Sequence, residues 1–155
     1  MLDLPCGDHG WMKTVDMSKL TRYVGADIVE SLILNNQAYS TDQKQFKVLD
    51  LTAGPVDCFD LVFVRDCFVH FSFEMFSRAL RNIQRSSSRF LLTTTFTEET
   101  RNKDIDTGGW RPINLRLAPY NLPEPLETIN EQCTEFGDTF KDKSMALWRI
   151  ADIAR

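Results

Sequence analysis

The chain has 155 residues, of which 43% are hydrophobic and 26% are charged. These values fit one compact domain with a sizeable core, so no second domain is expected. The net charge of −4 makes nucleic acid an unlikely partner, because proteins that bind a phosphate backbone usually concentrate Lys and Arg on one face. We find no signal peptide and no apolar run long enough to cross a membrane, so we expect a cytoplasmic location.

The four cysteines do not form a recognisable ligand or disulfide pattern. Cys6, Cys58, Cys67 and Cys133 share no CxxC motif, and no histidine lies at a metal-ligand spacing from them. We therefore expect neither a metal site nor a disulfide framework.

Acidic residues accompany the first three apolar runs. Residues 1–11 have the pattern of a buried strand that breaks into a Gly-containing turn, with Asp3 in the strand, and Asp27 and Asp50 follow in the second and third runs. Spacings of 24 and 23 residues suit a strand, turn, helix and turn in a right-handed crossover. Because a parallel sheet binds ligands beyond the carboxyl ends of its strands, the pattern predicts three carboxylates at one edge, suited to hydroxyl and amino groups.

The other elements up to residue 96 follow from hydrophobic periodicity. Apolar runs predict strands at 23–28, 46–51, 59–64 and 89–96. A helix capped by Ser72 is indicated by the stripe of Phe73, Phe76, Leu80 and Ile83. An earlier helix is indicated in the same way by Ile28, Val29, Leu32 and Ile33.

The composition changes after residue 97. Residues 97–125 are rich in Gly and Pro but keep aromatic side chains, which favours an ordered lid or substrate wall over a passive connector. Residues 126–131 and 145–153 predict two more strands. Their short polar connection favours antiparallel neighbours, so they should finish the sheet as a hairpin-like pair.

The series of motifs resembles the class I S-adenosylmethionine-dependent methyltransferases over nearly the whole chain. Asp3-Leu4-Pro5-Cys6-Gly7-Asp8 resembles the glycine-rich first motif of the family, Asp27 the acid after its second strand, and Asp50-Leu51 its third motif. The chain further resembles a little-characterised bacterial-type group within the family, at Trp11-Met12, Arg65 to His70, Thr93 to Phe96, Gly109 to Leu115 and Leu147-Trp148. The resemblance implies a Rossmann-like α/β sandwich, with a mostly parallel sheet finished by an antiparallel strand pair.

The resemblance also implies S-adenosylmethionine as the cofactor and gives roles to particular residues. Asp3, Cys6 and Gly7 would line its methionine end, Asp27 would meet the ribose hydroxyls, and Asp50 would meet the adenine amino group. The complete set expected to bind the cofactor is Asp3, Pro5, Cys6, Gly7, Trp11, Asp27, Ile28, Asp50, Leu51, Arg65 and Asp66. Pro5 departs from the family, which commonly has Gly there; proline fixes φ and removes a donor.

Two residues are candidates for catalysis. Asp66 would approach the methionine end of the cofactor or the acceptor. His70, four residues later, is a candidate to take a proton from the acceptor, with a packing or capping role as the alternative. We expect His9 to be exposed or to cap a turn. By position, Trp11, Phe68 and Trp110 are candidates for cation–π contact with the sulfonium, although core or lid packing is favoured for each of them. Arg65 and Arg111 are candidates for binding an anionic acceptor.

The expected organisation is a single methyltransferase domain over 1–155, with a cofactor-binding half at 1–96, a lid or substrate loop at 97–125 and the closing strands at 126–155. The expected acceptor is a small molecule or a glycan-type molecule. A catalytically silent cofactor-binding or partner module stays open, because the N-terminal helices usual in the family are expected to be absent. A nicotinamide-dependent oxidoreductase is disfavoured, because the first turn lacks the third Gly of G-x-G-x-x-G.

Overall fold

The computed structural model describes residues 1–154, which form a seven-stranded sheet in the order β3-β2-β1-β4-β5-β7-β6. Its strands are β1 (Leu2–Asp3), β2 (Tyr23–Asp27), β3 (Lys44–Val48), β4 (Leu61–Val64), β5 (Phe90–Phe96), β6 (Glu127–Asn130) and β7 (Lys143–Arg149). The first five are parallel where they pair, and β7 is antiparallel to both of its neighbours. The predicted fold class and the closing antiparallel pair are therefore confirmed.

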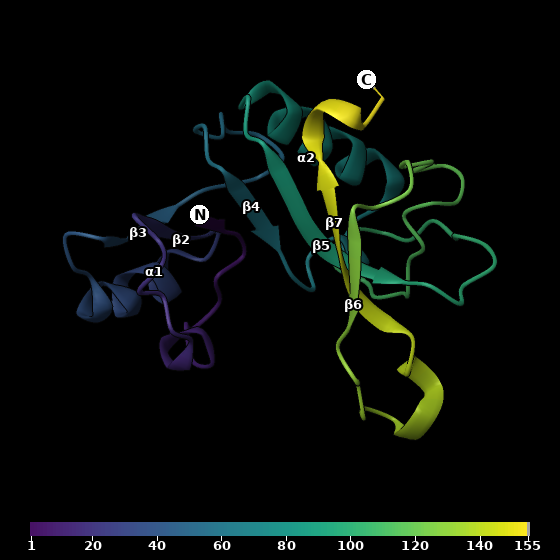
Figure 1. Ribbon diagram of the computed structural model, residues 1–155, viewed down its shortest axis with the longest axis horizontal. Coiled ribbons are helices and arrows are strands. Elements are labelled where there is room, and N and C mark those ends of the chain that lie inside the picture. The colour runs from purple at the N-terminus through teal and green to yellow at the C-terminus, as the bar shows by residue number, and fades with distance from the viewer. Residues whose placement is uncertain (155) are drawn as a thin grey trace.

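The helix α2 (Phe73–Arg85) covers one face of the sheet, behind β5 and β7 in the view of Figure 1. It buries Phe76, Ala79 and Ile83. Phe76 and Ile83 belong to the predicted stripe, whose other members, Phe73 and Leu80, are half-buried. The hydroxyl of Ser72 accepts a hydrogen bond from the Met75 backbone N–H, which satisfies one of the free donors at the start of the helix, as predicted. The side chains of α2 join those of the central strands in the main hydrophobic core.

The helical content of the first half is smaller than predicted. The helix α1 spans only Glu30–Asn36, and Ile28 and Val29 are exposed residues ahead of it, so the predicted four-residue buried stripe is wrong. Between β1 and β2 only the short 3-10 helix η1 (Met12–Thr14) forms. Residues 8–22 are mostly polar, and a segment with so few apolar side chains cannot cover a sheet face with an amphipathic helix.

Two strand boundaries also differ from the prediction. The third strand is Lys44–Val48, so Asp50 lies in the turn that follows it. The last strand ends at Arg149, and residues 150–152 form the 3-10 helix η5 (Ile150–Asp152), whose Ile150 packs into the core. In Figure 1, β6 and β7 extend beyond the rest of the sheet, and the 3-10 helix η4 (Gly137–Phe140) lies at their far end.

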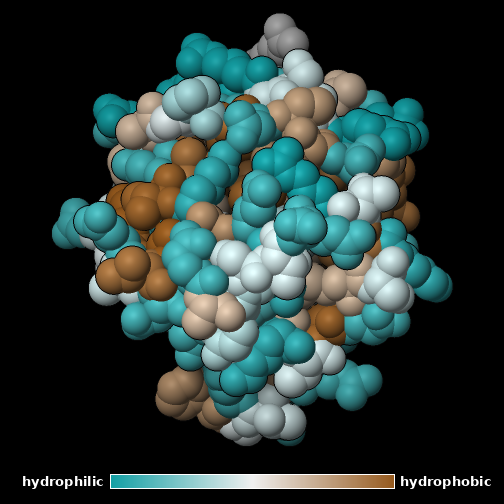
Figure 2. Space-filling model, turned by 90° about the vertical axis from the view of Figure 1, so that its left-hand side faces the viewer, coloured by the Kyte–Doolittle hydropathy of each residue, from teal (hydrophilic) through white to brown (hydrophobic). Residues whose placement is uncertain are grey.

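The side of the molecule formed by β2, β3 and α1 carries scattered hydrophobic side chains. Figure 2 views this side and shows several separate brown areas among hydrophilic ones. Exposed hydrophobic residues of these elements and the turns beside them are Ile28, Val29, Leu34, Tyr39 and Val48. Among residues 1–154, no helix is both long and apolar enough to span a membrane.

Candidate functional site

Two cavities lie side by side at the carboxyl ends of the parallel strands. The first, here the strand-end cavity, has a volume of about 350 Å³ and is lined by Leu4, Pro5, Ile28, Leu49, Asp50, Leu51, Thr52, Asp66, Cys67, His70, Phe71, Met75 and Thr107. The second, the aromatic cavity, has about 650 Å³ and is lined by Asp66, His70, Phe96, Trp110, Cys133, Glu135, Phe136, Thr139, Phe140 and Lys143. Both volumes are typical of ligand sites. Asp66 and His70 line both cavities.

The strand-end cavity contains five of the residues predicted to bind a cofactor, namely Pro5, Ile28, Asp50, Leu51 and Asp66. The carboxylate of Asp50 accepts two hydrogen bonds from Thr52, one from the backbone N–H and one from the hydroxyl, and both go to Oδ1. Among the described residues no hydrogen-bond donor contacts Oδ2 of Asp50, so this oxygen can accept a hydrogen bond from a ligand.

Asp27 lies behind the strand-end cavity and organises the first turn. Its Oδ2 accepts a hydrogen bond from the Gly7 N–H at 3.1 Å, and its Oδ1 accepts one from the Val29 N–H at 2.9 Å. Gly7 has a φ of +54°, a conformation in which glycine avoids the strain of a side chain, and its carbonyl accepts a hydrogen bond from Asn36. Cys6, next to it, is buried. The carboxylate therefore fixes the loop that brings Pro5 to the cavity.

Asp3 is buried beneath the same turn. Its Oδ2 accepts a 2.6 Å hydrogen bond from the Tyr23 hydroxyl, and burial raises the pKa of the Asp3 carboxyl to about 6. The Tyr23 oxygen lies 3.2 Å from Nδ1 of His9, which is fully buried among aromatic rings. The expectation that His9 is exposed or caps a turn is therefore wrong, and burial lowers its pKa.

Trp11 and Arg65 lie together beside the two cavities. The Arg65 guanidinium carbon is 5.5 Å from the centre of the Trp11 ring, a cation–π distance, and about half of the Trp11 side chain is exposed. Neither residue lines the strand-end cavity. Phe68, the second aromatic residue proposed for a sulfonium contact, is fully buried in the core.

Asp66 is held in an unusual backbone conformation at the end of β4. Its φ is +52°, a left-handed conformation that Asp tolerates better than most residues. The Asp66 N–H donates a 2.8 Å hydrogen bond to the Thr94 hydroxyl, and its Oδ2 accepts one of 2.8 Å from Lys143. Such backbone strain is concentrated at functional sites, and here it directs a carboxylate between the two cavities.

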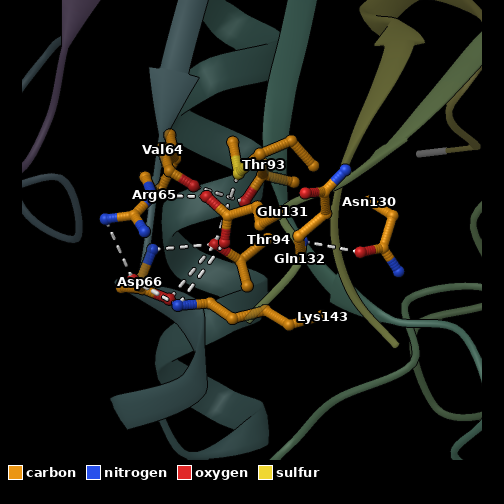
Figure 3. Close-up of polar contacts among 10 residues, drawn as sticks. Val64, Arg65, Asp66, Thr93, Thr94, Asn130, Glu131, Gln132 and Lys143 are labelled. Carbon is orange, nitrogen blue, oxygen red and sulfur yellow. Dashed lines mark hydrogen bonds and ion pairs between the residues drawn. The ribbon is translucent and has the colours of Figure 1, made fainter. Parts of the chain in front are cut away.

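Glu131, which the sequence did not single out, connects the antiparallel strand pair to this carboxylate. Figure 3 shows its side chain reaching from the end of β6 toward β4. Its Oε1 accepts a 2.6 Å hydrogen bond from Arg65, and its buried Oε2 lies 3.4 Å from Lys143 Nζ without hydrogen-bond geometry. Burial alone would lower the pKa of Lys143, but Asp66 and Glu131 raise it. Two cations and two carboxylates thus neutralise one another.

His70 ends the 3-10 helix η3 (Phe68–His70) with its ring fixed in one orientation. Its Nδ1 lies 2.7 Å from the Gly109 carbonyl oxygen, and the Gly108 N–H donates a hydrogen bond to the His70 carbonyl. A carbonyl can only accept, so Nδ1 must carry the hydrogen. In the neutral ring Nε2 then has a free lone pair and can take up a proton.

Arg111 holds the backbone around His70. Its five N–H groups donate hydrogen bonds to the carbonyls of Lys103, Phe68, Val69 and Phe71 and to the Tyr120 hydroxyl. A guanidinium has five donors, so none is left for a ligand, and the idea that Arg111 grips an anionic acceptor is wrong. Burial lowers the pKa of Arg111.

The aromatic cavity contains several residues that the sequence did not identify as site residues. They are Phe96, Cys133, Glu135, Phe136, Thr139, Phe140 and Lys143. They come from the end of β5, from the connection between β6 and β7 and from Lys143 at the start of β7, and Trp110 of the 97–125 loop joins them. No motif spacing relates these segments, which meet only because β7 lies beside β5.

Comparisons with known proteins agree with this arrangement. A family model described as "Methyltransferase domain" matches residues 2–88, more than half of the chain. No curated protein matches the chain.

Solved structures share the fold at low sequence identity. A Pyrococcus horikoshii OT3 protein is 17% identical with a TM-score of 0.65, and the alignment covers 96% of this chain and 80% of that one. A TehB-like SAM-dependent methyltransferase from Corynebacterium glutamicum is 18% identical (TM-score 0.60; 96% and 78% covered). Human N-acetylserotonin methyltransferase, solved with S-adenosylmethionine, is 15% identical (TM-score 0.68), and the chain covers only 46% of it. With its sheet order and its family match, this chain belongs to the class I S-adenosylmethionine-dependent methyltransferases.

Proposed function

We propose that this domain transfers a methyl group from S-adenosylmethionine to a small-molecule or glycan-type acceptor by in-line displacement. The cofactor occupies the strand-end cavity and the acceptor occupies the aromatic cavity. The observation that carries the proposal is that Asp66 and His70 line both cavities. Direct transfer requires donor and acceptor to meet at one point, and residues common to two adjoining cavities mark such a point.

The residues of the strand-end cavity fit this cofactor. Oδ2 of Asp50 is available to a donor such as the adenine amino group, and Ile28 and Leu51 contribute apolar side chains to the cavity wall. Asp27 is buried and does not line this cavity, so its support for the cofactor is indirect: its two carboxylate oxygens bind the Gly7 and Val29 N–H groups and hold the first turn in place. When bound, S-adenosylmethionine supplies a methyl group that its sulfonium has already activated.

The chain itself supplies position and a proton acceptor. His70 presents Nε2 because Gly109 holds its Nδ1 hydrogen, and Arg111 fixes the backbone on which His70 stands. Holding two reactants in line supplies effective molarities of roughly 10⁵ M or more, so no nucleophilic side chain is required. The 97–125 loop acts as a substrate wall, since Trp110 lines the acceptor side.

Two variants test the two halves of the proposal separately. Asp50→Ala should weaken S-adenosylmethionine binding, measured by calorimetry, because the ligand loses a charge-assisted hydrogen bond. His70→Gln keeps a polar side chain in the wall of both cavities, so it should change that affinity much less than Asp50→Ala does. It should lower the rate of methyl transfer about 10²- to 10⁴-fold, the usual contribution of a general base.

The outcomes separate the proposal from its alternative. A folded chain that binds no S-adenosylmethionine would contradict the cofactor assignment. Full activity of His70→Gln would show that His70 is not the general base. A chain that binds S-adenosylmethionine but methylates no acceptor would instead support a catalytically silent module.

A further inference from the structure

Aromatic rings form much of the wall of the aromatic cavity. Trp110 packs edge-on against Phe96, with centroids 6.1 Å apart, and against Phe140 at 4.9 Å. Phe136 packs against Phe140 in the same way at 5.9 Å. The side chains of Trp110 and Phe136 nevertheless remain 46% and 82% exposed, so ring surface is left for a ligand. Rings of this kind bind other rings by stacking or by edge-to-face contact.

The charged groups next to these rings are unsuited to an anion. The ammonium of Lys143 lies 2.8 Å from Asp66 and 3.4 Å from Glu131, and Arg65 is bound to the same two carboxylates (Figure 3). Both cations are therefore neutralised. Among the described residues no cation lies within ion-pair distance of Glu135, the remaining charged group of the cavity. An anionic ligand would be repelled by it, while a neutral or cationic ligand would not.

The proton acceptor between the cavities restricts the atom that is methylated. His70 Nε2 has a free lone pair, because the Gly109 carbonyl fixes the hydrogen on Nδ1. A lone pair at this place serves an acceptor atom that must lose a proton, such as a hydroxyl oxygen or an amino nitrogen.

From these three observations we propose that the acceptor is an aromatic hydroxyl or amino compound without anionic groups. This inference rests on the proposed function. The acceptor oxygen or nitrogen forms a bond to the methyl carbon while the sulfur–carbon bond breaks, and the electron pair of that bond stays on sulfur. The proton of the acceptor passes to Nε2 of His70.

A matched panel of phenols tests the class of acceptor with the full chain. Tyramine, para-ethylphenol and para-hydroxyphenylacetate carry the same phenol with a cationic, a neutral and an anionic substituent, and methyl glucoside represents a sugar. Binding is measured by calorimetry with S-adenosylhomocysteine present, and transfer with radiolabelled S-adenosylmethionine. We expect tyramine and para-ethylphenol to be methylated, the anion to react with at least tenfold lower kcat/KM, and the sugar not to react.

Three variants connect the result to the cavity. Trp110→Leu should lower kcat/KM for the phenols roughly tenfold, in proportion to one aromatic contact, with unchanged affinity for S-adenosylmethionine. Glu135→Gln, at an exposed position, should reduce the discrimination against para-hydroxyphenylacetate. Tyr39→Leu is the control, because Tyr39 is an exposed aromatic residue that lines neither cavity.

Each contrary result has a distinct meaning. Preference for the anion, methylation of the sugar alone, or failure of all three phenols to bind a chain that still binds S-adenosylmethionine would overturn this inference and leave methyl transfer intact. Failure to bind S-adenosylmethionine would overturn the proposed function itself.

Discussion

The two cavities are built in different ways. Most residues of the strand-end cavity follow β1, β2, β3 and β4 closely in the sequence, and only Met75 of α2 and Thr107 of the long loop come from elsewhere. The aromatic cavity draws on the end of β5, a long loop and the β6–β7 connection, and Glu131 joins β4 across 66 positions of sequence. Residues beside each other in a motif define the first site, and residues brought together by strand order define the second.

The two cavities are also stabilised by different kinds of contact. The strand-end cavity is held by hydrogen bonds from the Asp27 and Asn36 side chains to the Gly7 backbone and by packing around the first turn. The aromatic cavity depends on long-range contacts, in particular the ion pairs of Glu131 and the hydrogen bonds of Arg111. Mutations that remove long-range contacts should therefore cost more stability than mutations of local features.

The largest expected effect is that of Arg111→Met. Methionine replaces the hydrocarbon part of the arginine side chain, but the five hydrogen bonds of the buried guanidinium are lost. We therefore expect the free energy of unfolding to fall by about 3–5 kcal/mol. Urea denaturation measures the change. Arg116→Met is the matched control, because the exposed ion pair of Arg116 with Glu124 should contribute at most about 1 kcal/mol. Equal losses in the two variants would contradict the role of Arg111 as a long-range support.

The next effect concerns Asp3 and depends on pH. Its pKa is raised from 3.8 to about 6 in the folded chain, so the folded state binds more protons than the unfolded state between these values. The contribution of Asp3 to stability is therefore greatest below about pH 4 and decreases as pH rises through 6, by about 2–3 kcal/mol in total.

Asp3→Asn should remove that part of the pH dependence and make the chain more stable than the wild type at pH 7. The measurement is urea denaturation of both proteins from pH 4 to pH 7.5. Parallel stability curves for the two proteins would show that burial does not raise the pKa of Asp3.

A smaller effect is expected from Glu131→Gln, which tests the link between the sites. The amide keeps the shape of the side chain but leaves Arg65 and Lys143 with one carboxylate fewer in a partly buried place, which should cost about 2 kcal/mol. Glu74→Gln is the control, because Glu74 forms an exposed ion pair with Arg78 on α2. If the two variants lost the same free energy of unfolding, the strand pair would be held by packing alone.

The smallest effect belongs to a local feature. Ser72→Ala removes the side-chain cap of α2 and should cost about 1 kcal/mol. Ser77→Ala, within the same helix, removes only a hydrogen bond to the Phe73 carbonyl and should change stability by less than about 0.5 kcal/mol. Thermal unfolding of both variants measures the difference, and a larger loss at Ser77 would refute the capping role.

Much of the fold and half of the candidate site could be predicted from patterns of the sequence. Strand periodicity located β2, β4 and β5 closely, and strand-end motifs identified Asp50 and Asp66 as cavity residues. The helical crossovers were over-predicted, because spacing limits the length of a connection without determining whether its side chains can cover a sheet.

The sequence alone determined three features: the order in which the motifs of the parallel strands follow one another, the capped helix α2, and the class of cofactor that the resemblance implies. Each of these depends on residues that are neighbours in the chain. Only the tertiary structure decided which residues line the aromatic cavity, that His9 and Arg111 are buried, and that Glu131 meets Arg65. The physical reason is that β7 pairs with β5 rather than extending the sheet beyond β6. This pairing brings distant side chains together, and no local pattern in the chain records such a contact.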